Sequence, residues 1–198
     1  MAIIPPLEKS LVVPDYPIFR LTVEQYHAMI KAGILTDDDP VELLEGWLVT
    51  KMPQNPPHLT ITQHTHDVLR RIIPPGWFTN VQGPITTADS EPEPDIVVVR
   101  GSRLDYMERL PTSSDIALVI EVSDTTLHRD RTLKLRVYAS ARIAIYWILN
   151  LPERQLEAYS QPEAAAYRQQ RVYTEAEAVP VVIDGQEVGR IAVRDLLP

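Results

Sequence analysis

The segment DIALVIEVSD, residues 115–124, reads as a β-strand whose apolar run ends in a carboxylate. Five apolar residues, Ile116 to Ile120, lead directly into Glu121 and Val122. A carboxylate within an apolar strand costs free energy unless another group pairs with it. We therefore expect Glu121 to have a partner elsewhere in the chain.

A second apolar strand, PDIVVVR at residues 94–100, carries Asp95 at its entrance. If the two strands pair antiparallel, neighbouring strands lie about 4.8 Å apart and Asp95 meets Glu121 at one edge of the sheet. Two adjacent carboxylates repel unless they share a proton or a cation. Oxygen ligands suit Mg²⁺ or Mn²⁺, so the pair predicts a divalent metal site. In the alternative, Asp95 only opens a strand after Pro94 and Glu121 faces solvent.

Lys134 is the third candidate, on a helix expected near residues 130–141 that Asp130 opens in its first turn. Asp130 and Tyr138 stand four residues before and after Lys134, so the three share one helix face. A lysine directed at the metal site can orient an attacking water or neutralise developing negative charge. The alternative is a surface lysine that pairs with Asp130.

The remaining helices and the hairpin follow from local signals. Thr22 followed by Gln25 is a capping box, which predicts a helix over residues 23–32. Apolar residues at three- and four-residue steps predict another helix over 58–73, and Glu45-Gly46 predicts the turn of a hairpin within 41–51.

Strand signals dominate the second half of the chain. Together with the helices they predict an α/β or α+β domain with a mixed sheet flanked by helices, preceded by an N-terminal helix and hairpin. The expected strands are WFTNVQ (77–82), DIVVVR (95–100), IALVIEV (116–122), IAIYWIL (143–149), QLEAY (155–159) and RVY (171–173).

Length and composition set outer limits. The 198 residues predict one domain, with an extended arm over 1–20 and a β-rich extension over 155–198. The absence of cysteine excludes disulfides, thiolate metal sites and a cysteine nucleophile. No apolar run approaches the length of a membrane span, so we expect a cytoplasmic protein without a membrane partner.

The formal net charge of −8 by itself disfavours nucleic-acid binding, which needs clustered lysine and arginine. Basic residues do cluster in sequence after Glu121, and we expect this cluster to be a solvated helix face. Its members are Arg129, Arg131, Lys134, Arg136 and Arg142.

Several motifs follow one another along the chain: VELLEG (41–46), His58 at the start of the next helix, SEPEPDIVVVRG (90–101), LVIEVSDTTLHRDRTLKLRVYA (118–139) and YWILNL (146–151). In this order they resemble the Uma-type restriction endonuclease family, abundant in cyanobacteria, within the PD-(D/E)XK nuclease superfamily. The resemblance extends from about Leu21 to Tyr159.

The resemblance implies a restriction-endonuclease-like core and Mg²⁺-dependent or Mn²⁺-dependent hydrolysis of DNA by metal-activated water. It implies that Asp95, Glu121 and the Val122 carbonyl hold the metal. The superfamily's usual lysine position is Ser123 here, so the resemblance implies that Lys134 has taken over that role from the helix. Glu42, His58, Asp130 and Tyr138 would support these groups.

Glu42 could hold a second ion or an outer water, and His58 could act as an acid, orient a ligand or cap its helix. A further departure is Arg142, where the family generally has glycine. The resemblance also implies a homodimer, because two sites can then address two strands. Two alternatives stay open: a catalytically inactive nuclease-like binding module, and a metal-dependent hydrolase of another phosphoester.

Overall fold

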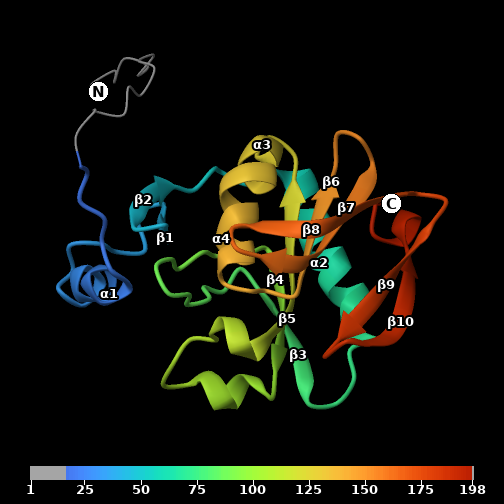
Figure 1. The fold of residues 1–198 in the computed structure, drawn as a ribbon, viewed down its shortest axis with the longest axis horizontal. Coiled ribbons are helices and arrows are strands. Elements are labelled where there is room, and N and C mark those ends of the chain that lie inside the picture. Colours follow the sequence, from blue (N-terminus) through green and yellow to red (C-terminus); the bar gives the residue numbers. More distant parts are fainter. Residues whose placement is uncertain (1–16, 198) are drawn as a thin grey trace.

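The computed structural model describes residues 17–197, which form a mixed β-sheet with helices on both faces (Figure 1). The sheet has six strands in the order β3-β4-β5-β6-β7-β8, and only β5 and β6 run parallel. This confirms the expected mixed sheet. The strands are β3 (Trp77–Val81), β4 (Ile96–Arg100), β5 (Ile116–Ser123), β6 (Ile145–Asn150), β7 (Gln155–Glu163) and β8 (Ala166–Thr174).

Strand β5 lies inside the sheet, and all of its residues are buried. It pairs antiparallel with β4, with Ile96 opposite Ile120. Asp95 and Glu121 therefore occupy the next position along this pair, at the edge where β4 begins and β5 ends. Since side chains alternate between the faces of a strand, both carboxylates lie on the same face as Val97 and Val119.

Helix α2 (Pro56–Arg70) covers one face of the sheet. It begins two residues before the expected range because Asn55 is the N-cap, accepting a hydrogen bond from the His58 N–H, and prolines fill the first turn. It ends at Arg70 rather than at residue 73. A hairpin of β9 (Ala178–Ile183) and β10 (Gln186–Ala192) packs into the same hydrophobic cluster.

The opposite face is covered by a helical segment that differs from the expected 130–141 helix. It consists of α3 (Leu127–Arg129), a π-helical turn (Asp130–Lys134) and α4 (Leu135–Ser140). Asp130 is therefore not in the opening turn of the helix. Its carboxylate instead accepts hydrogen bonds from the hydroxyls of Ser123 and Thr126, at 2.7 and 2.6 Å.

The N-terminal part contains α1 (Val23–Lys31) and a hairpin of β1 (Val41–Leu44) and β2 (Trp47–Thr50), to one side of the sheet (Figure 1). The capping box of Thr22 and Gln25 is confirmed. Most of the arm expected over residues 1–20 lies outside the described residues. Strands β7 and β8, in the region expected as an extension, continue the central sheet. Among residues 17–197, no helix is long and apolar enough to cross a membrane.

Candidate active site

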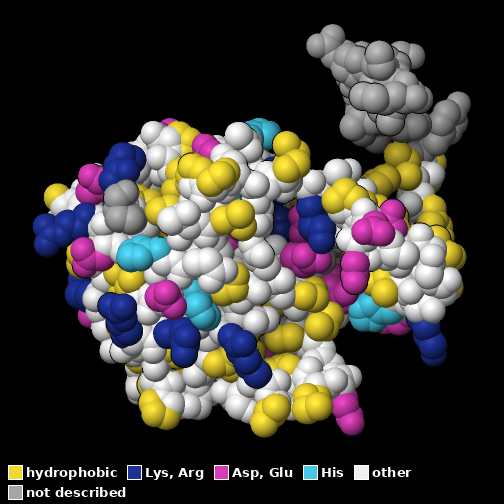
Figure 2. Space-filling view, turned by 180° about the vertical axis from the view of Figure 1, so that it is seen from behind, with side chains coloured by type: hydrophobic (Ala, Val, Ile, Leu, Met, Phe, Trp, Pro, Cys, Tyr) yellow, Lys and Arg dark blue, Asp and Glu magenta, His cyan; other side chains and the backbone are white. Residues whose placement is uncertain are grey.

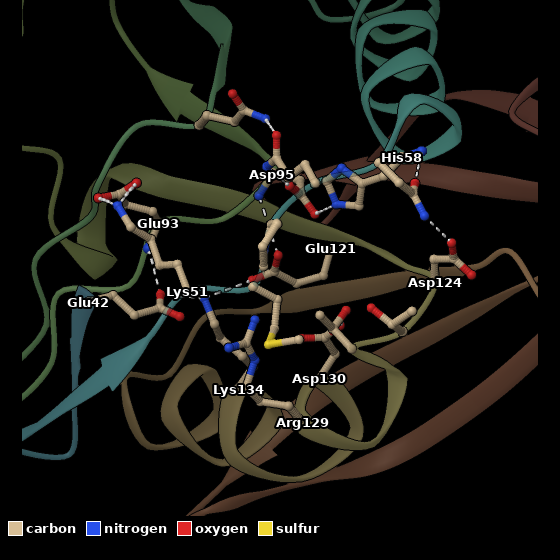
Figure 3. Close-up of a pocket in the computed structure, with 17 residues that line it drawn as sticks. Glu42, Lys51, His58, Glu93, Asp95, Glu121, Asp124, Arg129, Asp130 and Lys134 are labelled. Carbon is tan, nitrogen blue, oxygen red and sulfur yellow. Dashed lines mark hydrogen bonds and ion pairs between the residues drawn. The ribbon is translucent and has the colours of Figure 1, made fainter. Parts of the chain in front are cut away.

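A pocket of about 350 Å³ opens at the end of the sheet where β4 begins and β5 ends (Figure 3). Its walls come from the β1–β2 hairpin, the start of α2, the two strands and the π-helical turn. The charged and imidazole side chains that line it are Glu42, Lys51, His58, Glu93, Asp95, Glu121, Asp124, Arg129, Asp130 and Lys134.

Asp95 and Glu121 lie next to each other in this pocket. The Asp95 N–H donates to Glu121 Oε2 at 3.4 Å, and the Val122 N–H donates to Asp95 Oδ2 at 2.8 Å. The two residues are only 7% and 5% exposed, so the alternative in which Glu121 faces solvent is wrong. The antiparallel pairing thus brings the two carboxylates together as expected.

Lys134 reaches the same pocket from the π-helical turn. Its Nζ lies 2.7 Å from Glu42 Oε2 and 3.4 Å from Glu121 Oε1, and the residue is 2% exposed. The alternative of a surface lysine paired with Asp130 is therefore wrong. Glu42 also accepts a hydrogen bond from the Glu93 N–H at 3.1 Å, so it ties Lys134 to the segment that leads into Asp95.

Burial and neighbouring charges shift the pKa values of Glu121 and Lys134 in this pocket. Loss of water raises the pKa of Glu121 to about 8; the charge of Lys134 opposes this shift, and Asp95 and Asp130 add to it. Burial alone would lower the pKa of Lys134, but the carboxylates of Glu121 and Glu42 outweigh it and raise that pKa. Lys134 therefore stays charged, whereas Glu121 holds a proton near neutral pH when no cation is bound.

Tyr138 and His58 hold the two carboxylates in place. The Tyr138 hydroxyl donates to Glu121 Oε1 at 2.5 Å, from the turn of α4 that follows Lys134. The His58 Nε2 lies 3.0 Å from Asp95 Oδ2. Burial acts to lower the pKa of His58, but the hydrogen bond and charge of Asp95 outweigh it and raise that pKa. The interpretation of His58 as a helix cap is wrong, because Asn55 caps α2.

Ser123 occupies the position of the superfamily's usual lysine, and the structure gives it a different contact. Its hydroxyl donates to Asp130, which anchors the π-helical turn to the end of β5. Lys134 is the last residue of that turn. The serine therefore helps to fix the segment that carries the lysine into the pocket.

Sequence reasoning did not place several residues in this pocket. Lys51 pairs with Glu93 at 2.9 Å, and the Asn55 amide donates to Asp124 at 2.5 Å. Arg129 donates to the Thr50 carbonyl at 3.1 Å. A signal existed only for Asn55, which precedes two prolines as an N-cap residue would.

The basic cluster in sequence is only in part the solvated helix face that we expected, because only Arg136 and Arg142 are exposed. Arg131 pairs with the buried Glu157 at 2.6 Å, and Arg136 pairs with Glu45 at 2.5 Å. Lys134 is buried in the pocket. Intramolecular carboxylates thus neutralise much of this cluster.

The donor set fits a small divalent cation. Mg²⁺ is commonly held by one or two carboxylates and keeps several waters, so Asp95 and Glu121 supply enough protein ligands. Within residues 17–197, no group of three or more His, Cys, Asp or Glu side chains is arranged to hold a metal ion. Water would therefore have to complete the coordination shell.

Comparison with known proteins identifies the family of the chain. A model of the Uma2 family, described as "Putative restriction endonuclease", matches residues 23–193. The chain belongs to this family. The match covers most of the sequence and includes the motifs found in the sequence analysis. The family name indicates a nuclease-type function.

A solved structure shows the same fold. A protein from Anabaena variabilis ATCC 29413, described as a "putative nuclease belonging to DUF820", is 19% identical, with a TM-score of 0.62. The match covers 89% of this chain and 97% of that chain. At this identity the likeness establishes the restriction-endonuclease-like fold alone. No curated protein matches the chain.

Proposed function

We propose that this Uma2 protein is a divalent-metal-dependent endonuclease that hydrolyses DNA phosphodiester bonds. The observation that carries the proposal is the meeting of Asp95, Glu121 and the Lys134 ammonium at one buried pocket edge. Structural ion pairs alone do not require two adjacent buried carboxylates beside an open pocket. Strongly shifted pKa values in a cleft are typical of active sites.

Asp95, Glu121 and the Val122 carbonyl would hold Mg²⁺ or Mn²⁺. When bound, the ion supplies positive charge that polarises a phosphate oxygen and lowers the pKa of a bound water. Lys134 keeps its proton and faces Glu121 at 3.4 Å, where it can position the attacking water or offset charge that develops on the phosphate.

Glu42, Tyr138 and His58 position these groups without touching the reacting atoms. Glu42 holds the Lys134 ammonium, Tyr138 fixes one oxygen of Glu121, and His58 fixes one oxygen of Asp95. Asp130 acts further back, by anchoring the π-helical turn through Ser123 and Thr126.

Cleavage of supercoiled plasmid in Mg²⁺ or Mn²⁺ tests the proposal. Asp95→Asn and Glu121→Gln keep side-chain size and should abolish cutting, because each removes a metal-binding carboxylate. Glu163→Gln is the matched control, since its carboxylate is exposed and pairs with Arg168 on the far edge of the sheet. Circular dichroism verifies that each variant folds. The proposal would be contradicted if the wild type showed no metal-dependent cutting, or if both site variants cut plasmid as fast as the wild type.

A second candidate is a metal-dependent hydrolase of a smaller phosphoester. The pocket wall favours it, because Glu42, Glu93 and Asp124 add negative charge beside the two metal-binding carboxylates and would repel a polyanion. A panel of mononucleotides and bis(p-nitrophenyl) phosphate separates the two candidates. Turnover of these compounds without plasmid cutting would favour the smaller substrate.

We infer that the protein forms a homodimer, so that two pockets can address the two strands of DNA. The chain mass is 22.4 kDa, and light scattering should give twice this value. A single-chain mass at micromolar concentration would contradict the dimer without affecting the proposed chemistry.

A further inference from the structure

Two arginines without a carboxylate partner among the described residues lie together outside the active site. Most arginines of residues 17–197 lie against a carboxylate, as Arg100, Arg131 and Arg136 do. Arg70 and Arg103 have no carboxylate within 4.0 Å among these residues, and both line a second pocket of about 490 Å³. Figure 2 views the face covered by α2, where lysine and arginine side chains gather on the lower part.

This second pocket has the composition of an anion site. Arg70 comes from the last turn of α2, and Arg103 comes from the short helical turn that follows β4. The lining residues also include Trp77, Thr79 and Ser102, and none of them is acidic. Asp105, the neighbouring carboxylate, is engaged by the Ser102 N–H at 2.8 Å.

Thr79, on β3, is a buried polar residue of the pocket wall. It lines the pocket and is 3% exposed, and its hydroxyl is buried without a hydrogen-bond partner among the described residues. Buried hydroxyls normally have a partner, because an unpaired one costs free energy. Arg103 donates one N–H to the Thr79 carbonyl at 3.3 Å, which ties its guanidinium to β3 and leaves its other donors available.

The positive charge of Arg70 and Arg103 also affects the pKa of His66, which lies one turn before Arg70 on α2. Burial lowers its pKa, and the charges of Arg70 and Arg103 lower it further, while Asp67 opposes them. Arg70 alone could be explained as a basic residue that complements the carbonyl end of α2. That explanation does not cover Arg103, which belongs to another segment and converges on the same pocket.

Helix α2 also links the two pockets. His58 in its first turn lines the active-site pocket, and Arg70 in its last turn lines the second one. With a rise of 1.5 Å per residue, the two ends are about 18 Å apart. Successive phosphates of a DNA strand are about 3.4 Å apart along the axis, so about five nucleotides span this distance.

We propose that Arg70 and Arg103 bind a backbone phosphate of the DNA strand whose scissile phosphate lies in the active-site pocket. The assignment to DNA rests on the nuclease function proposed above. A contact about five nucleotides away supplies attraction that the acidic active-site pocket lacks. It thereby lets a protein with net charge −8 hold a polyanion.

Fluorescence anisotropy of a labelled DNA duplex of about 20 base pairs, in EDTA and over a range of KCl, tests this site without catalysis. Arg70→Gln/Arg103→Gln should weaken binding about tenfold, because charge-assisted hydrogen bonds to a phosphate are lost. The slope of log K against log salt should fall in magnitude by about 0.9, the value for one phosphate contact. The matched control is Arg168→Gln/Arg171→Gln, which removes the same charge from exposed ion pairs on β8.

The control should bind DNA like the wild type. Unchanged binding by Arg70→Gln/Arg103→Gln, or an equal loss in the control, would overturn the site. Calorimetry with inorganic phosphate forms a separate arm: phosphate binding that depends on Arg70 and Arg103, with DNA affinity unaffected, would overturn the assignment to DNA.

These outcomes are distinct from those of the plasmid assay. If the wild type fails to cut plasmid but its binding still depends on Arg70 and Arg103, the nuclease function fails and the phosphate site stands. If plasmid cutting depends on Asp95 but DNA affinity is unchanged in Arg70→Gln/Arg103→Gln, the nuclease function stands and the phosphate site fails.

Discussion

At the scale of single residues, Glu121 is a carboxylate whose burial is offset by specific partners. Tyr138 donates to one of its oxygens, and the Asp95 N–H donates to the other. The Lys134 ammonium is nearby but lies closer to Glu42. One buried cation thus lies between two carboxyl groups, and its charge offsets the loss of solvation at Glu42 and part of that loss at Glu121.

Replacing Lys134 by methionine should therefore destabilise the protein strongly. The change leaves the Glu42 carboxylate buried without its cation, and removal of one partner of a buried ion pair costs about 3–5 kcal/mol. Urea unfolding at pH 7 measures this loss. The double variant Lys134→Met/Glu42→Gln should recover a large part of it, because the carboxylate that had lost its cation is also removed. Equal stabilities of the single and double variants would contradict the shared-cation arrangement.

The candidate residues were predictable where charge interrupts an apolar strand. Asp95 and Glu121 stand out in this way, and their strands are adjacent in sequence order, so the antiparallel pairing followed from a simple assumption. The partner of Lys134 was not predictable by such reasoning. Glu42 lies 92 positions away in the chain, and no local pattern relates two residues across that separation.

At the scale of elements, the π-helical turn is the feature that sequence periodicity missed. A wider turn changes only a few residues, and the apolar spacing before and after it still fits an ordinary helix. Its hydrogen bonds from Ser123 and Thr126 to Asp130 connect it to the end of β5. Such turns occur frequently at functional sites, which agrees with the placement of Lys134 at its end.

The end of α4 contains a residue in an unfavourable conformation. Arg142 has φ of 58°, and the N–H groups of Arg142 and Ile143 donate to the carbonyls of Ala139 and Tyr138. This is a Schellman ending, whose left-handed residue is usually glycine. Arg142→Gly should therefore stabilise the protein by about 1 kcal/mol, measured as a shift of the urea midpoint at unchanged m-value.

Ser140→Gly is the control for this change. Ser140 is the last residue of α4 and has a helical conformation, so glycine there should destabilise the protein by about 0.5–1 kcal/mol. If both substitutions shifted the midpoint in the same direction, the left-handed conformation at Arg142 would not be the cause.

At the scale of the whole molecule, charge is divided between two ends of α2. Carboxylates concentrate around the active-site pocket, whereas Arg70 and Arg103 lie beside the second pocket without a carboxylate among the described residues. Net charge alone therefore does not describe how charge is distributed over the described chain. The sequence could not reveal the division, because Arg70 and Arg103 are far apart in the chain, and two arginines of the sequence cluster, Arg131 and Arg136, are neutralised by ion pairs.

The buried carboxyl of Glu121 should make both stability and metal binding depend on pH. Its pKa is raised from 4.5 to about 8 in the metal-free fold, so between these values the folded chain holds a proton that the unfolded chain has released. Stability of the metal-free protein should then fall as pH rises through this window. Mn²⁺ needs the ionised carboxylate, so the increase in Tm caused by Mn²⁺ should grow over the same window. Thermal scans from pH 5 to 8, with and without Mn²⁺, measure both trends, and Glu121→Gln should flatten them. Equal pH dependence in wild type and Glu121→Gln would assign the trends to another group.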